Sequence, residues 1–316
     1  MERRSILAAG LAAPALLGTA RAQTAAPAAE PTAPAFHRFQ VGATPVFVLR
    51  EGNVARPDIR QGSVVNASPE QVQAALNAAG ITDYAVPNPF TPTAVQTRDG
   101  LVLIDAGFGQ GAPNGAGSLF ASMRAAGLDP ASVRTVVFTH FHGDHVGGLL
   151  AADGSPAFPN ATIKVPEGEW AFWNSDDEMN RGPAARRPAF ENARRRFAPY
   201  AAKVERFRAG AEVAPGVTSV ATFGHSPGHC SFLVSDGNQQ ALVIGDAVNN
   251  PALFMANSEW YPGFDMDPPT AVATRKALLD RAATERMPVI GYHFPMPATG
   301  RVERSGTGYR LVPVNA

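Results

Sequence analysis

Residues 140–145 constrain this chain more than any other segment, because the stretch HFHGDH places three histidines and an aspartate within six positions. The whole chain of 316 residues contains only 7 histidines. Imidazole and carboxylate groups are the ligands that Zn, Fe, Mn and Co accept in hydrolytic centres. His140 and His142 can both turn toward one ion from a tight turn, while Asp144 and His145 face a second ion. The segment therefore predicts the beginning of a two-metal site.

Four short apolar runs end in polar residues that could complete this site. The runs LVLID, VVFTH, LVIGD and VIGYH end in Asp105, His140, Asp246 and His293. Polar residues at the exits of apolar strands are well placed to converge at one rim of a sheet, so we expect these side chains to lie close together.

The ligands can be divided between two ions. We assign His140, His142 and His229 to one ion, Asp144, His145 and His293 to the other, and Asp246 to a bridging position with room for a water. His225 lies four residues before His229, and we expect it to brace the loop rather than to bind metal. His37 lies away from these motifs and is expected to be structural.

The remaining pattern predicts a layered α/β protein. Strands are expected at residues 44–50, 101–107, 134–140, 161–165, 217–223, 231–237, 240–246 and 288–293, where apolar runs are bounded by Gly, Asp and Pro. Helices are expected at 68–80, 117–127 and 269–285; the first has Ser68 as N-cap, Pro69 in its first turn and Gly80 as its stop. Many strands with interspersed helices indicate sheets covered by helices.

The N-terminal residues predict export. Residues 1–22 combine Arg3 and Arg4, an apolar stretch and small residues at Ala20 and Ala22, which is the pattern of a secretory signal. The two arginines fit a twin-arginine signal, and an ordinary secretory signal with a basic start is the alternative. We expect residues 23–35 to be a flexible Ala/Pro leader, 36–316 to form one domain, and the mature protein to be periplasmic or secreted.

Charge and hydrophobicity exclude some partners. The formal net charge is zero, which argues against a nucleic-acid binder with a broad basic face. No segment after the signal is apolar for long enough to span a membrane. The basic stretch at residues 186–197 could attract an anionic substrate, but a solvated helix face is the more common meaning of such a run.

Four motifs together resemble the metallo-β-lactamase fold superfamily: THFHGDHVGG at 139–148, SPGHCSF at 226–232, LVIGDAV at 242–248 and VIGYH at 289–293. The resemblance implies an αββα sandwich of two mixed sheets with outer helices and a dinuclear site at one edge. It also implies that Asp105 orients a ligand of the first loop. The cofactors are expected to be two divalent ions, Zn first, although the ligands suit Mn, Fe or Co as well.

A finer resemblance covers residues 158–175 and 293–316, which look like the exported methyl parathion hydrolase-like and lactonase branch. That branch implies hydrolysis of aryl lactones and esters, in some members of organophosphate triesters, and by analogy a homodimer. Trp173 and Phe190 match two aromatic residues of its substrate pocket, with ordinary core packing as the alternative. A third aromatic residue is missing near Ala112, which puts triesterase activity in doubt.

The expected reaction is attack by a metal-bridging hydroxide, with Asp144 and Asp246 holding the ions. The bridging Asp246 departs from true metallo-β-lactamases, so antibiotic hydrolysis is not expected. The substrate would be a small-molecule ester, lactone or phosphotriester. The alternatives are a phosphodiesterase-type metallohydrolase and a non-catalytic exported metal-binding protein.

Overall fold

The computed structural model describes residues 34–110, 112 and 115–313. The predicted signal and nearly all of the predicted leader lie outside these residues. Among the described helices, none has the length and apolar character needed to cross a membrane.

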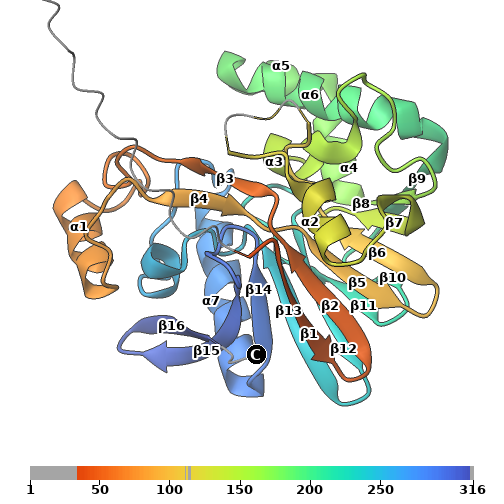
Figure 1. Ribbon diagram of the computed structural model, residues 1–316. Helices are drawn as coiled ribbons and strands as arrows, with labels where there is room; N and C mark the ends of the chain where they lie inside the picture. Colours follow the sequence, from red (N-terminus) through yellow and green to blue (C-terminus); the bar gives the residue numbers. More distant parts are fainter. Residues whose placement is uncertain (1–33, 111, 113–114, 314–316) are drawn as a thin grey trace, which may run out of the picture. The chain divides into compact units, whose positions relative to one another are not determined.

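Two seven-stranded mixed sheets form the centre of the fold (Figure 1). The first runs in the order β1 (Phe36–Val41), β2 (Thr44–Leu49), β5 (Thr93–Thr97), β6 (Gly100–Ile104), β7 (Val133–Val137), β8 (Thr162–Pro166) and β9 (Val204–Phe207). The second runs β10 (Glu212–Ala214), β11 (Val217–Ala221), β12 (Cys230–Asp236), β13 (Gln239–Gly245), β14 (Pro288–Gly291), β15 (Thr299–Ser305) and β16 (Gly308–Pro313). A separate pair joins β3 (Gly52–Ala55) to β4 (Pro87–Phe90).

The strand directions place the site. Strands β6 to β9 are parallel to one another, and β13 and β14 form the parallel pair of the second sheet. Parallel neighbours deliver their carboxyl ends to the same edge, and ligands commonly bind beyond those ends in α/β sheets. The segments that follow β6, β7, β13 and β14 carry Asp105, His140, Asp246 and His293.

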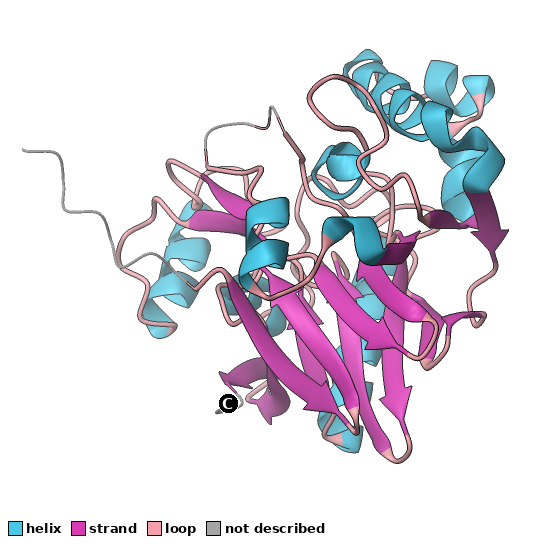
Figure 2. Cartoon of the chain, turned by 45° about the vertical axis from the view of Figure 1, so that its right-hand side comes forward, coloured by secondary structure: helices cyan, strands magenta, loops and turns pink. Residues whose placement is uncertain are grey.

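Helices lie outside the strands, and in Figure 2 most of them gather above the strands. The α-helices are α1 (Pro69–Ala78), α2 (Leu119–Ala125), α3 (Gly143–Val146), α4 (Glu167–Trp173), α5 (Asp176–Arg181), α6 (Arg187–Phe197) and α7 (Pro268–Glu285). Short 3-10 turns cover Pro130–Ser132, Gly147–Leu149, Ala184–Arg186 and Ala198–Lys203, and a π turn covers Pro251–Met255.

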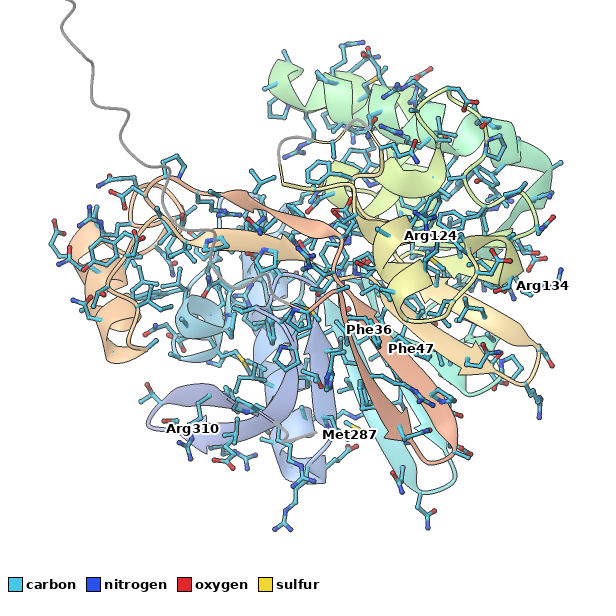
Figure 3. All side chains as sticks on the ribbon, in the orientation of Figure 1. Phe36, Phe47, Arg124, Arg134, Met287 and Arg310 are labelled. Atoms are coloured by element: carbon cyan, nitrogen blue, oxygen red, sulfur yellow. The ribbon has the colours of Figure 1, made fainter. Side chains whose placement is uncertain are left out.

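Two apolar clusters hold the layers together. One is shared by both sheets and includes Val48 of β2, Val137 of β7 and Phe232 of β12. The other packs the first sheet against α2, α4 and α6, with Phe138 and Phe197 edge to face at 5.5 Å. Figure 3 shows the side chains on this frame, including Phe36 and Phe47, whose rings meet at 6.5 Å between β1 and β2.

The predicted αββα fold is confirmed by these layers. Helix α1 begins after Ser68, which forms a reciprocal capping box with Gln71. The strand expected at 134–140 ends at Val137, because the chain leaves the sheet there to form the histidine loop. The basic run near residue 190 is helix α6, which buries Phe190, Ala193 and Phe197 on its inner side and leaves Arg187 and Arg195 exposed.

Candidate metal centre

Loops from both sheets converge on one cluster of histidines and aspartates. His140 and His142 follow β7, and Asp144 and His145 lie on α3. The second sheet contributes His225 after β11, Asp246 after β13 and His293 after β14. The folded chain thus brings together residues separated by about half of its length.

Three ring nitrogens form the first part of the centre. The Nε2 atom of His225 lies 3.2 Å from Nε2 of His140 and 3.0 Å from Nδ1 of His142. The three candidate ligand atoms all lie within 4.8 Å of one another. Three imidazoles pointing at one place are a typical ligand set for Zn and for other divalent transition metals.

Asp246 lies in the middle of the whole cluster. Its Oδ1 is 3.3 Å from Nε2 of His145, and its Oδ2 is 3.1 Å from Nε2 of His293 and 3.4 Å from Nε2 of His225. The second part of the centre is Asp144, His145 and His293, whose ligand atoms also lie within 4.8 Å of one another. Asp246 therefore reaches both parts of the centre.

Two orphaned buried atoms support a metal ligand role. Among the described residues, neither Nε2 of His145 nor Oδ1 of Asp246 has a hydrogen-bond partner, although both residues are buried. A buried polar atom without a partner costs about 1–3 kcal/mol, so such atoms call for an ion or water. The set of imidazole and carboxylate groups fits two divalent cations.

The electrostatic surroundings keep two histidines neutral. Burial, followed by the neighbouring histidines, holds the pKa of His140 and His142 well below the ordinary value. Burial also acts to lower the pKa of His145, but Asp246, Asp144 and Asp105 outweigh it and raise that pKa well above 6.5. The pKa of Asp246 is well below its usual range, because His293 and His145 outweigh the effect of burial. Neutral imidazoles and an ionised carboxylate are the forms that bind metal, so His140, His142 and Asp246 already have the binding form, whereas His145 would release its proton when it binds a metal ion.

One predicted ligand requires correction. We expected His229 to join His140 and His142, and His225 to brace the loop, but the structure brings His225 to that position. Both ring nitrogens of His229 are used within the protein, since Nδ1 lies 2.8 Å from Thr222 Oγ1 and Nε2 accepts the Asp246 backbone N–H at 3.1 Å. His229 thus positions Asp246.

The exchange has a local reason. His229 directly precedes β12, and its ring lies beneath Gly245, where an added Cβ would meet Nε2 at 2.8 Å. His225 lies in the turn after β11, with a ring free to face the cluster. Both histidines stand in the motif GHSPGH, so spacing alone does not distinguish them.

Buried acids orient the two key histidines. Asp105 Oδ2 lies 2.8 Å from Nδ1 of His145, and the Thr139 backbone N–H and hydroxyl both donate to Asp105 at 2.8 Å. Asp105 has a φ of 61°, an uncommon left-handed conformation for a residue other than glycine. On the other side, Asp265 Oδ1 lies 2.9 Å from Nδ1 of His225, and Arg275 donates to Asp265 Oδ2 at 3.0 Å. Such partners fix ring orientation and tautomer in metal sites.

Three further residues near the centre were not predicted from the sequence. Tyr292 stacks on His145 at 3.9 Å and donates its hydroxyl to the Asp144 carbonyl at 2.6 Å. Glu51 is fully buried, and burial raises its pKa to about 7. Glu169, also fully buried, accepts four hydrogen bonds between the histidine loops. Single acidic residues outside a motif carry no sequence signal, although Tyr292 directly precedes a predicted ligand.

Trp173 and Phe190 lie in the hydrophobic core that packs on the first sheet. Trp173 is 1% exposed, its indole N–H donates to Glu169 at 2.7 Å, and its ring packs on Phe190 at 4.7 Å. The structure therefore supports the core alternative for both residues. The Trp173 ring still packs edge to face on the His142 ring at 5.9 Å, so it helps to hold this candidate ligand in place.

Two curated proteins are similar to part of this chain in sequence. N-acyl homoserine lactonase AttM of Agrobacterium fabrum is 32% identical over 129 residues, covering 39% of this chain and 43% of that protein. AttM of Azorhizobium caulinodans is 30% identical over 169 residues, covering 52% and 60%. The chain thus matches less than two thirds of the length of these relatives.

Solved structures resemble the fold over most of its length. The hydrolase AbOPH of the beta-lactamase superfamily aligns with a TM-score of 0.83 and 25% identity, covering 90% of this chain and 98% of that one. AidC, a dizinc quorum-quenching lactonase, aligns with a TM-score of 0.82 and 21% identity, covering 89% and 98%. The family model of the metallo-beta-lactamase superfamily matches residues 91–293, which is more than half of the chain. This match includes every candidate metal ligand, and the chain belongs to the metallo-beta-lactamase superfamily.

Proposed function

We propose that this protein is a dinuclear metal-dependent hydrolase that acts on lactones and aryl esters. The observation that carries the proposal is the position of Asp246 between two groups of ligands. Its Oδ1 lies 3.3 Å from Nε2 of His145, and neither atom has a hydrogen-bond partner among the described residues. A complete and mostly buried ligand set argues against a non-catalytic metal-binding protein, in which broken ligand positions are expected.

Some residues of the centre would bind the metal ions, and others orient those ligands. His140, His142 and His225 would hold one ion, Asp144, His145 and His293 the other, and Asp246 both. Asp105, Asp265 and His229 keep the rings and the bridging carboxylate in place through the hydrogen bonds described above. Two divalent ions bound there would lower the pKa of a bound water and polarise the oxygen of the scissile group. Zinc is the metal we expect.

Support for lactones comes from the relatives, since the curated proteins with the strongest sequence matches given above are N-acyl homoserine lactonases. Aryl esters share the planar carbonyl and add a good leaving group. Phosphotriesters present a tetrahedral phosphorus centre instead. Phosphotriesters and phosphodiesters are therefore the competing substrate classes that the test must distinguish from lactones and esters.

The test uses protein lacking the signal, loaded with Zn or Mn, whose metal content is measured by mass spectrometry. We would compare kcat/KM for an N-acyl homoserine lactone, an aryl lactone, an aryl ester and an aryl phosphotriester in one buffer. The proposal expects about two metals per chain and the highest kcat/KM on a lactone or ester. A preference for the triester or a phosphodiester would overturn the substrate class, and no turnover at full metal content would overturn the hydrolase.

We also propose that the protein is exported to the periplasm or beyond. The full chain would be expressed in a Gram-negative host and fractionated, and the N-terminus of the exported form sequenced. We expect it to begin at Gln23. Replacing both Arg3 and Arg4 by Lys should block export if the route is twin-arginine and leave it intact if the route is the general one.

A further inference from the structure

Arg56 contacts Phe264, an aromatic ring that also contacts the candidate metal ligand His225. It directly follows β3, which lies with β4 at the upper end of the sheets in Figure 1, the end that also carries α3. Its guanidinium carbon is 5.7 Å from the centroid of the Phe264 ring, and the Phe264 ring is 5.6 Å from that of His225. Phe264 thus connects Arg56 to a candidate ligand.

The charge of Arg56 meets the Phe264 ring but no carboxylate among the described residues. Among the described residues, none forms a hydrogen bond or an ion pair with its side chain, although the side chain is only partly exposed. The acid nearest in sequence is Asp58, which accepts two hydrogen bonds from the Arg60 side chain at 2.9 and 2.8 Å and one from its backbone N–H at 3.0 Å. Burying a charge is costly unless it is paired, so the position favours an anion from outside the chain.

The carboxylates that act electrostatically on Arg56 belong to the candidate metal centre. Burial lowers the pKa of Arg56, while the charges of Asp246 and Asp144 act to raise it. Both aspartates are candidate metal ligands, and bound cations would neutralise them. With metal bound, these two aspartates would no longer offset the charge of Arg56.

A hollow next to Arg56 can hold part of a small molecule. It has a volume of about 530 Å³, and its lining includes Arg56, Phe264, Gln61, Ser63 and also Asp58, whose carboxylate is paired with Arg60. Ligand pockets commonly combine an aromatic wall with a few polar groups, and a guanidinium binds a carboxylate through two parallel hydrogen bonds. The aromatic ring and the planar cation suit an aryl group that carries a carboxylate.

We propose that Arg56 and Phe264 form a subsite that binds a carboxylate-bearing aryl group of the substrate next to the metal centre. The inference rests on the proposed ester or lactone hydrolysis and narrows its substrate class to anionic aryl esters and lactones. Arg56 acts as a specificity-determining residue: it pairs with the carboxylate while water is added across the acyl C–O bond at the metal centre.

The test compares 4-acetoxybenzoate with the neutral 4-acetoxybenzamide on the metal-loaded protein, in which hydrolysis releases acetate and the corresponding phenol. The variants are Arg56→Gln and Arg56→Lys, with Arg98→Gln as the matched control, because Arg98 is 82% exposed and its removal changes the net charge equally. The intrinsic reactivity of the two esters does not affect the comparison, because the ratio of their kcat/KM values is compared between variants. Metal content and melting temperature are checked for all of them.

We expect Arg56→Gln to lower kcat/KM for the benzoate ester about 10-fold or more, mainly through KM, and to change the benzamide ester less than about 3-fold. Arg56→Lys should fall between, because it keeps the charge and loses the paired hydrogen bonds. Arg98→Gln should behave like the wild type. Equal losses on both esters, or no loss on either, would overturn the subsite.

A second measurement separates this inference from the proposed function. The dissociation constant of benzoate is measured by calorimetry on metal-loaded wild type and Arg56→Gln, and we expect about 10-fold weaker binding by the variant. If neither ester is hydrolysed but benzoate still binds through Arg56, the hydrolase proposal fails and the subsite stands. If both esters are hydrolysed while benzoate binds the variant as well as the wild type, or does not bind at all, the subsite fails and the hydrolase stands.

Discussion

His225 and His229 lie four residues apart, and their ring nitrogens meet different partners. Nε2 of His225 faces two other imidazoles and Asp246, whereas Nε2 of His229 accepts the backbone N–H of Asp246. The same side chain therefore serves as a candidate ligand at one position and as a support at the other. Replacing each histidine should therefore have a different effect on metal binding.

We predict that His225→Ala lowers the metal content from about two ions per chain to about one and reduces kcat by at least about 1,000-fold, because it removes a ligand. His229→Gln should keep nearly full metal content while lowering the melting temperature, since buried groups around Thr222 and Asp246 lose a partner. Mass spectrometry and thermal unfolding of both variants check this. Loss of metal from the His229 variant, with retention in the His225 variant, would restore the original assignment.

Glu51 is a buried carboxyl whose protonation is coupled to folding. It accepts the backbone N–H groups of Gly109 and Gly117 at 3.2 and 2.7 Å, and burial raises its pKa from 4.5 to about 7. Between these two values the folded chain binds the proton and the unfolded chain does not. Stability contributed by the protonated carboxyl is therefore lost as the pH rises through this window.

We predict that wild-type protein, with metal chelated, loses about 3 kcal/mol of unfolding free energy relative to Glu51→Gln between pH 4.5 and 7, at about 1.4 kcal/mol per pKa unit. The amide oxygen of the substituted side chain can still accept the two backbone N–H groups, but the amide does not titrate. Urea unfolding at several pH values measures the difference. Parallel pH curves for the two proteins would show that Glu51 does not titrate in this range.

Helix α4 connects the two halves of the centre through Glu169. Its Oε2 accepts the Phe141 backbone N–H at 3.1 Å, and its Oε1 accepts Ser226 Oγ and the Gly228 N–H at 2.6 and 2.7 Å. Phe141 lies between His140 and His142, and Ser226 follows His225. One carboxylate thus fixes the spacing of loops that come from different sheets.

We predict that Glu169→Gln weakens metal affinity about 10-fold or more and lowers the unfolding free energy by about 1–3 kcal/mol. The NH₂ group of the glutamine side chain would face hydrogen-bond donors, from which it cannot accept a hydrogen bond. Glu167→Gln on the same helix is the control, since Glu167 pairs with the exposed Arg208 and such pairs contribute little. Competition with a chelator measures the affinity. Equal effects of the two variants would contradict the role of Glu169.

At the scale of the whole molecule, the candidate ligands join the two sheets. His140, His142, Asp144 and His145 belong to the first sheet and its helices, and His225, Asp246 and His293 to the second. Any ion bound to both groups would add a contact that exists only in the folded state. Metal binding should therefore stabilise the whole fold rather than one loop.

We predict that chelation lowers the melting temperature and that readdition of Zn or Mn restores it. With free metal at about 1,000 times its Kd, the stabilisation is about 4 kcal/mol for one site. Calorimetry of the apo and loaded protein checks the shift, and Asp246→Asn should show a smaller one. An identical melting temperature with and without metal would contradict the bridging of the two sheets.

The sequence by itself predicted the layered fold and most of the candidate ligands, because strand periodicity and the crowding of HFHGDH are local patterns, while the role of Asp105 was implied by the family resemblance. The fold alone decided which histidine of GHSPGH faces the cluster, and it placed Trp173 and Phe190 in the core. Only the fold joined Glu169 to two distant loops and Arg56 to Phe264. The physical reason is that direction and burial of a side chain depend on segments that pack against it from elsewhere in the chain, and no local pattern records them.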